Sequence, residues 1–144
     1  MLVHQILKAK SDDGVVTLPE GTTVSEAVEV LSSRKIGAIV ISNDGKTPTG
    51  IISERDIVRE LGRQGAACLV ETVGSVMTKN LISCARDDTA DQVLAKMTEG
   101  RFRHMPVLDA DVMIGLISIG DVVKARLSEL SMEKDALEGM IMGH

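Results

Sequence analysis

The chain has 144 residues, of which 44% are hydrophobic and 26% charged, and its net charge is −5. The acidic balance and the single phenylalanine, with no tyrosine or tryptophan, argue against nucleic acid or an anionic membrane surface as the main partner. The apolar runs are short, and the N-terminus lacks a basic segment followed by an apolar stretch. We therefore expect no membrane span and a cytoplasmic location.

The first half of the chain is expected to form one unit with the order strand, helix, strand, turn, strand, helix. The spacing of hydrophobic residues, the turn residues and a Thr-x-x-Glu capping box predict its helices and strands. They are a helix start at 3–7, a strand at 15–18, a helix opened by the box at 23–26, strands at 38–41 and 50–52, and a helix from residue 53.

The second half repeats this order about 66 residues later. Its predicted pieces are a helix start at 73–77, a strand at 81–84, a helix opened by the Thr-x-x-Gln box at 89–92, strands at 105–108 and 115–117, and a helix from residue 118. The last helix should continue to Gly139 with an apolar stripe, and because it outruns its own unit we expect it to pack on a partner. The stripe consists of Val123, Leu127, Leu130, Leu137 and Ile141.

A ten-residue motif at the end of each unit makes the repeat specific. Residues 50–59 read Gly-Ile-Ile-Ser-Glu-Arg-Asp-Ile-Val-Arg, and residues 115–124 read Gly-Leu-Ile-Ser-Ile-Gly-Asp-Val-Val-Lys. Such repetition predicts two similar units, and one unit of about 60 residues is marginal alone. The expected fold class is α+β, with two pseudo-symmetric β-α-β-β-α units, 1–66 and 67–144, packed through their sheets as one module.

The Ser-x-x-Asp in each motif has two interpretations. It is a helix start, because serine caps a free backbone N–H group and aspartate is favourable near the positive helix end. It is also a nucleotide site, because the hydroxyl and free N–H groups suit phosphate and the carboxylate can accept hydrogen bonds from ribose hydroxyls.

The two motifs, the capping boxes and Arg-His-Met-Pro-Val at 103–107 together resemble a tandem pair of cystathionine-β-synthase (CBS) domains, also called a Bateman module. The resemblance covers about residues 3–127 and leaves no room for an attached enzyme or transporter, so it implies a stand-alone CBS-domain protein. Such pairs bind adenine nucleotides between the two units and act as energy or metabolite sensors.

The resemblance implies a set of ligand-binding residues. Asp56 and Asp121 would hold ribose hydroxyls, and Ser53 and Ser118 would contact ribose or phosphate. Residues near phosphate and base would be Arg103, His104, Met105 and Pro106 in the second unit and, at the aligned places that lack a cation, Gly37 and Ala38 in the first. Residues near adenine would be Thr78, Asn80 and Leu81, with Lys10 and Val16 in the first unit; Arg55 would reach a phosphate or pair with a neighbouring acid.

Two functions from different classes remain open. The first is a regulatory sensor module that binds AMP as the first candidate, or ATP, ADP, NAD(H) or an S-adenosyl compound, and acts on a separate, unknown protein. The second is a structural dimerisation module with vestigial nucleotide sites. We expect no catalysis and no metal, because the chain has no phosphate loop, no His-x-x-x-His pair and no nucleophile elbow. We also expect a homodimer.

Overall fold

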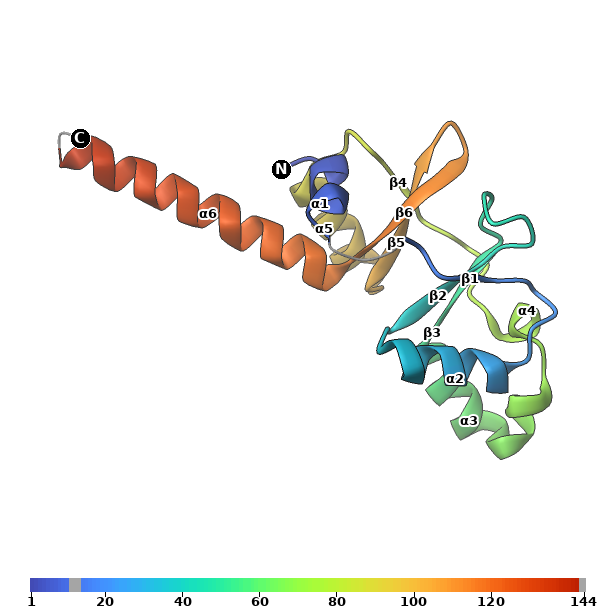
Figure 1. Ribbon diagram of the computed structural model, residues 1–144. Coiled ribbons are helices and arrows are strands. Elements are labelled where there is room, and N and C mark those ends of the chain that lie inside the picture. Colours follow the sequence, from blue (N-terminus) through green and yellow to red (C-terminus); the bar gives the residue numbers. More distant parts are fainter. Residues whose placement is uncertain (11–13, 143–144) are drawn as a thin grey trace.

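The computed structural model describes residues 1–10 and 14–142 as two three-stranded sheets with helices packed around them (Figure 1). In chain order the elements are α1 (Val3–Ala9), β1 (Thr17–Leu18), α2 (Val24–Arg34), β2 (Ala38–Ile41), β3 (Gly50–Ser53), α3 (Glu54–Gln64), the 3-10 helix η1 (Gly65–Val70), α4 (Val73–Val76), β4 (Cys84–Ala85), α5 (Ala90–Gly100), β5 (His104–Asp109), β6 (Val112–Ser118) and α6 (Ile119–Ile141). Within these described ranges no helix is both long and apolar enough to span a membrane.

The two sheets have the same topology. β1 runs parallel to β2 and β2 antiparallel to β3, and β4, β5 and β6 repeat this arrangement. The register repeats as well, since Ala38 lies opposite Ser53 and His104 lies opposite Ser118. The predicted α+β fold of two similar units is therefore confirmed.

The units pack against each other through their sheets. Along β2, Ile39 and Ile41 belong to the core of the first unit, whereas the alternate residues Ala38 and Val40 belong to a separate cluster. This alternation follows from the two-residue period of a strand. The separate cluster combines both units: Ala38, Val40 and Ile51 with Val15, Leu81, Met113 and Leu116.

Each core also includes a short helix from the other half of the sequence. Val3 and Ile6 of α1 are buried in the core that β5, β6 and α5 build, and Val73 and Val76 of α4 are buried in the core of the first sheet. Figure 1 shows α1 beside α5 and the start of α6. The chain thus crosses between the units twice, and a sequence boundary at residue 66 remains a prediction.

The crossings explain the glycine that opens each motif. A Cβ atom on Gly50 would lie 2.4 Å from Met77 Sδ and 3.0 Å from the Thr78 carbonyl oxygen. A Cβ atom on Gly115 would lie 2.8 Å from the Leu7 side chain. Each glycine therefore makes room for the segment that arrives from the other half of the chain.

We expect Gly50→Ala to destabilise the protein by about 1 to 3 kcal/mol, because the new methyl group must displace Met77 or the backbone of Thr78. Gly62→Ala is the matched control. Gly62 lies within α3 with nothing within 4 Å of its added Cβ atom, so alanine should stabilise the helix by about 0.5 to 1 kcal/mol. Urea unfolding of both variants measures the difference, and a Gly50→Ala variant as stable as the wild type would contradict the packing argument.

Several sequence-based boundaries were wrong in detail. The strand predicted at 81–84 is reduced to Cys84–Ala85, so Leu81 and Ile82 are free to line a cavity. β5 extends one residue beyond the predicted strand at each end, and Arg101 ends α5 with a left-handed φ of 57°. β6 is longer than predicted, because a tight turn at Ala110 and Asp111, both with positive φ, lets it pair back to Asp109.

Candidate functional site

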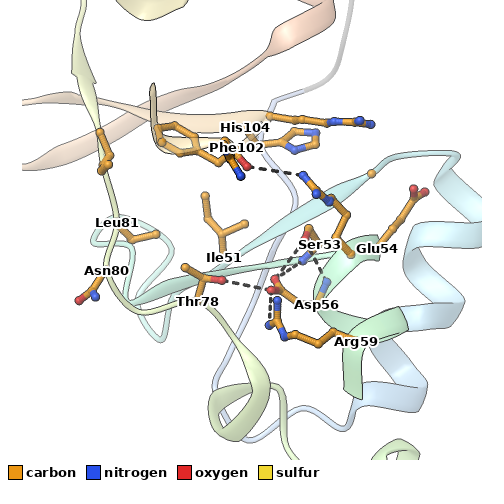
Figure 2. A pocket seen from close by; sticks show the side chains of 16 residues that line it. Ile51, Ser53, Glu54, Asp56, Arg59, Thr78, Asn80, Leu81, Phe102 and His104 are labelled. Atoms are coloured by element: carbon orange, nitrogen blue, oxygen red, sulfur yellow. Dashed lines mark hydrogen bonds and ion pairs between the residues drawn. The ribbon is translucent and has the colours of Figure 1, made fainter. Parts of the chain in front are cut away.

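A cavity of about 770 Å³ lies between the two units, and we call it the first cavity. It is within the usual range for a site that binds a small organic molecule. The first unit contributes Gly37, Ile51, Ser53, Glu54, Arg55, Asp56 and Arg59. The segment that connects α4 to β4 contributes Thr78, Asn80, Leu81 and Ile82. The end of α5, the turn after it and the start of β5 contribute Gly100, Arg101, Phe102, Arg103 and His104. Figure 2 shows Phe102 and His104 facing Ser53 and Asp56 across this space.

The Ser-x-x-Asp box of the first unit forms the start of α3. Ser53 accepts a hydrogen bond from the Asp56 N–H group, and the Asp56 carboxylate accepts one from the Ser53 N–H group at 2.9 Å. The next N–H group, of Glu54, donates to the Gly37 carbonyl oxygen at 3.0 Å. The helix-start interpretation is therefore confirmed, and these groups, expected to be free for a phosphate, are used within the protein.

The buried Asp56 carboxylate is the centre of a hydrogen-bond network (Figure 2). Its Oδ1 atom accepts hydrogen bonds from Arg59 Nη2 at 2.7 Å and from the Thr78 hydroxyl at 3.2 Å. Only 4% of the residue is exposed. Thr78 follows α4 and reaches this place because its backbone pairs with Ile51 at the edge of the first sheet. Asp56 thus ties the connecting segment to the first unit.

The cationic groups of the first cavity are four arginines, at 55, 59, 101 and 103, against two carboxylates, at 54 and 56. Arg59 is held by Asp56, and Arg55 donates a long hydrogen bond of 3.5 Å to the Arg101 carbonyl oxygen. The side chains of Arg101 and Arg103 have no hydrogen-bond or ion-pair partner within residues 1–10 and 14–142. Unpaired guanidinium groups at the rim of a cavity suit a phosphate group.

The opposite part of the lining is apolar. Ile51, Leu81, Ile82 and Phe102 line the first cavity beside Thr78. Such a mixture of apolar surface and a few polar groups suits the flat base and the sugar of a nucleoside. His104 lies next to this surface, and its burial, aided by the Lys10 charge, lowers the pKa of its imidazole below the ordinary value.

A second cavity, of about 460 Å³, lies on the other side of Gly37 and His104, which line both cavities. It is lined by Leu7, Lys10, Gly14, Val15, Val16, Ile36, Gly37, Ala38, His104, Ile114, Gly115, Leu116 and Ser118. Lys10 is the cation of this lining, whereas the first cavity holds four arginines. The two cavities therefore differ in the cationic groups of their linings.

The second Ser-x-x-Asp box also starts a helix, α6, but its carboxylate differs from Asp56. Asp121 accepts hydrogen bonds from the Ser118 N–H group at 2.8 Å and forms an ion pair with Lys10 Nζ at 2.8 Å. Lys10 also donates to the Leu116 carbonyl oxygen. Burial alone would raise the pKa of Asp121, but the hydrogen bonds from Lys10 and Ser118 hold that pKa below its ordinary value.

The structure groups the predicted residues across the units and not within them. Thr78, Asn80, Leu81, Arg103 and His104, all from the second half of the sequence, line the first cavity with the Ser-Asp box of the first half. Lys10 and Val16 line the second cavity with Ser118. The sequence-based grouping by unit was wrong because it did not foresee the two chain crossings.

Three predicted residues line neither the first nor the second cavity. Met105 is fully buried in the core of the second unit, and Pro106 is buried in the sheet. Asp121 lines a third cavity, of about 420 Å³, beside α1 and α6. Conversely, Arg59 and Arg101 were missed; the Asp-x-x-Arg spacing at 56–59 could have indicated that Arg59 pairs with Asp56, since side chains three apart on a helix are neighbours.

Comparisons with known proteins agree with this fold. The CBS domain family matches residues 8–63 and again 73–128. A CBS-domain containing protein, ATU1752 from Agrobacterium tumefaciens, is 44% identical, with a TM-score of 0.83 over 88% of this chain and 99% of that chain. PAE2072 from Pyrobaculum aerophilum, a CBS domain protein solved as a complex with AMP, is 26% identical, with a TM-score of 0.77 over 92% of this chain and 99% of that chain.

Curated relatives agree as well. The mitochondrial CBS domain-containing protein CBSX3 of Arabidopsis thaliana is 36% identical over 141 residues, which are 94% of this chain and 68% of that protein. The chain spans only 22% of another relative from the same plant, CBSCBSPB3. The fold and the repeated boxes define a tandem CBS-domain protein, and the chain belongs to the CBS domain family. Because one relative is named mitochondrial, the cytoplasmic location stays a prediction.

Proposed function

We propose that this chain is a regulatory module that binds a phosphorylated adenosine compound in the first cavity and acts on a separate protein. The observation that carries the proposal is the combination, in one cavity between the units, of an apolar surface with the unpaired guanidinium groups of Arg101 and Arg103. The apolar part suits a base, and the guanidinium groups suit a phosphate.

The comparison with PAE2072 supports the choice of ligand. That protein was solved with AMP, and it shares the fold of this chain over nearly its whole length. AMP is therefore the first candidate, and ATP and ADP fit the same charge. NAD(H) carries the same adenosine with phosphate groups and remains within the proposal, whereas S-adenosyl compounds have no phosphate and fall outside it. In this proposal the protein binds the nucleotide without converting it chemically. The proposed location of the protein is the cytoplasm.

A second candidate function is a structural module without a ligand. It is favoured by one observation: both Ser-x-x-Asp boxes are satisfied within the protein, Asp56 by Ser53, Arg59 and Thr78, and Asp121 by Ser118 and Lys10. In this function the boxes are only helix caps, and no adenosine compound would change the stability of the fold.

Thermal melts with AMP, ATP and adenosine separate the two functions. A ligand that binds only the folded state stabilises it by about 2.7 kcal/mol at a hundredfold excess over its Kd, which raises Tm. We expect AMP and ATP to raise Tm and adenosine, which lacks the phosphate, to raise it less. No shift by any of them at millimolar concentration would overturn the proposal.

ATP incubated overnight with the protein and magnesium should be recovered unchanged, and product formation would contradict the absence of turnover.

A further inference from the structure

One face of α6 is exposed although it is apolar. Along the first turns the helix packs on its own unit through Val122 and Ala125, which are buried, and Glu129 forms an ion pair with the N-terminal amino group. From there α6 projects away from the rest of the protein (Figure 1). The exposed apolar side chains on the other face are Val123, Leu127, Leu130, Leu137 and Ile141.

These side chains follow the spacing of a coiled coil. The intervals between Val123, Leu127 and Leu130 are four and three residues, and the same intervals continue through Lys134 to Leu137 and Ile141. In heptad terms, the d positions are Val123, Leu130 and Leu137, and the a positions are Leu127, Lys134 and Ile141. The buried Val122 and Ala125 fall at c and f, opposite this seam. The seam therefore points away from the protein's own core.

We propose that α6 forms an antiparallel two-stranded coiled coil with α6 of a second copy of this chain. One register pairs every seam position. Val123 faces the partner's Ile141, Leu127 faces the partner's Leu137, and Leu130 faces the partner's Lys134. The helix of 23 residues is about 34 Å long, so the two globular bodies lie at opposite ends of the paired helices.

Charge selects the antiparallel arrangement. In a parallel pair, Lys134 of one copy would face Lys134 of the other in the seam, and Glu133 would approach the partner's Glu138 twice. In the antiparallel register the two Lys134 side chains are apart, each with its aliphatic stem over a leucine. Lys124 then approaches the partner's Glu138, and symmetry repeats this attraction. The two Glu133 side chains approach each other once, at the exposed edge.

The Lys134 position also explains why this pairing is specific. A single lysine at an a position lowers the stability of a coiled coil but fixes its register and orientation. Lys134 is largely exposed in one copy and lies 3.9 Å from Glu138 of its own helix. Its ammonium group can therefore stay in water when the helices pair.

Sedimentation velocity of the full chain over about 1 to 200 µM tests the interface through a matched pair of variants. Leu137 and Met132 are 59% and 60% exposed on the same helix, but Leu137 lies in the seam and Met132 lies outside it. We expect Leu137→Asp to raise the dimer Kd at least hundredfold and Met132→Asp to leave it unchanged, with both variants keeping the wild-type far-ultraviolet circular dichroism. A wild-type monomer throughout this range would overturn the proposal. So would a dimer that survives Leu137→Asp, which would move the interface elsewhere, such as to the exposed Val58 and Leu61 of α3.

A charge exchange tests the orientation. Lys124→Glu alone or Glu138→Lys alone should raise the dimer Kd about tenfold, because each converts two attractive approaches into repulsive ones. The double variant Lys124→Glu with Glu138→Lys should return to within about threefold of the wild type. Fourteen residues separate the two positions in one helix, so they can compensate only across the pair. A double variant as weak as the sum of its single changes would overturn the antiparallel register. This test uses protein without nucleotide, so it does not depend on the proposed ligand.

Discussion

Asp56→Ala is expected to lower the free energy of unfolding by about 3 kcal/mol. The change removes the carboxylate of a capping box and leaves the Thr78 hydroxyl and the Arg59 guanidinium group without their acceptor. Loss of a helix cap costs about 1 kcal/mol, and loss of partly buried hydrogen bonds to a charged group costs about 1.5 to 3 kcal/mol. The connecting segment at Thr78 should also lose part of its attachment to the first unit.

Asp121→Ala is the matched control, because Asp121 holds the same place in the second box. Its side chain is 21% exposed, whereas that of Asp56 is 6% exposed. The Lys10 ammonium group keeps its hydrogen bond to the Leu116 carbonyl oxygen after the change, so the expected loss is nearer 1 to 1.5 kcal/mol. Urea unfolding of both variants at pH 7 measures the difference. Equal losses would show that the contacts of Asp56 to Arg59 and Thr78 add nothing to the cap.

The fold could be predicted from the sequence because its determinants are local and occur twice. The Ser53 and Ser118 boxes and the Thr23 and Thr89 caps each fix a helix start within four residues of chain, and all four helices begin there. The alternation along β2 then decides which side chains face the other unit. Local signals of this kind need no knowledge of distant contacts.

The composition of the candidate site could not be predicted in the same way. It depends on the backbone pairing between Ile51 and Thr78, which brings the connecting segment to the edge of the first sheet. No residue of that segment carries a periodic or capping signal for this contact. The same limit applies to Lys10, whose ion pair with Asp121 joins residues more than a hundred positions apart. The sequence thus suggests which residue types to expect at a site, whereas their grouping depends on contacts between distant parts of the chain.

Arg103→Ala is expected to weaken the binding of ATP and AMP by about 10- to 150-fold. The Arg103 side chain lines the first cavity and has no partner in the described part of the chain, so a phosphate group would gain charge-assisted hydrogen bonds from it. Hydrogen bonds to charged groups contribute about 1.5 to 3 kcal/mol, which sets this range of Kd. The fold should be little changed, because the contact that Arg103 makes with α6 uses its backbone carbonyl oxygen, which accepts a hydrogen bond from the Ile119 N–H group.

Two controls test whether Arg103 binds a phosphate group or acts only through its positive charge. One is a variant of another arginine, and the other is a ligand without a phosphate. Arg86 is half exposed in the same unit and lies outside the cavity lining, so Arg86→Ala removes the same charge and should leave every Kd within about twofold. Adenosine has no phosphate, so its weaker binding should be the same in the wild type and in Arg103→Ala. Isothermal titration calorimetry of the three proteins with ATP, AMP and adenosine gives all nine values. If Arg103→Ala weakened adenosine as much as ATP, the side chain would shape the cavity and would not bind a phosphate.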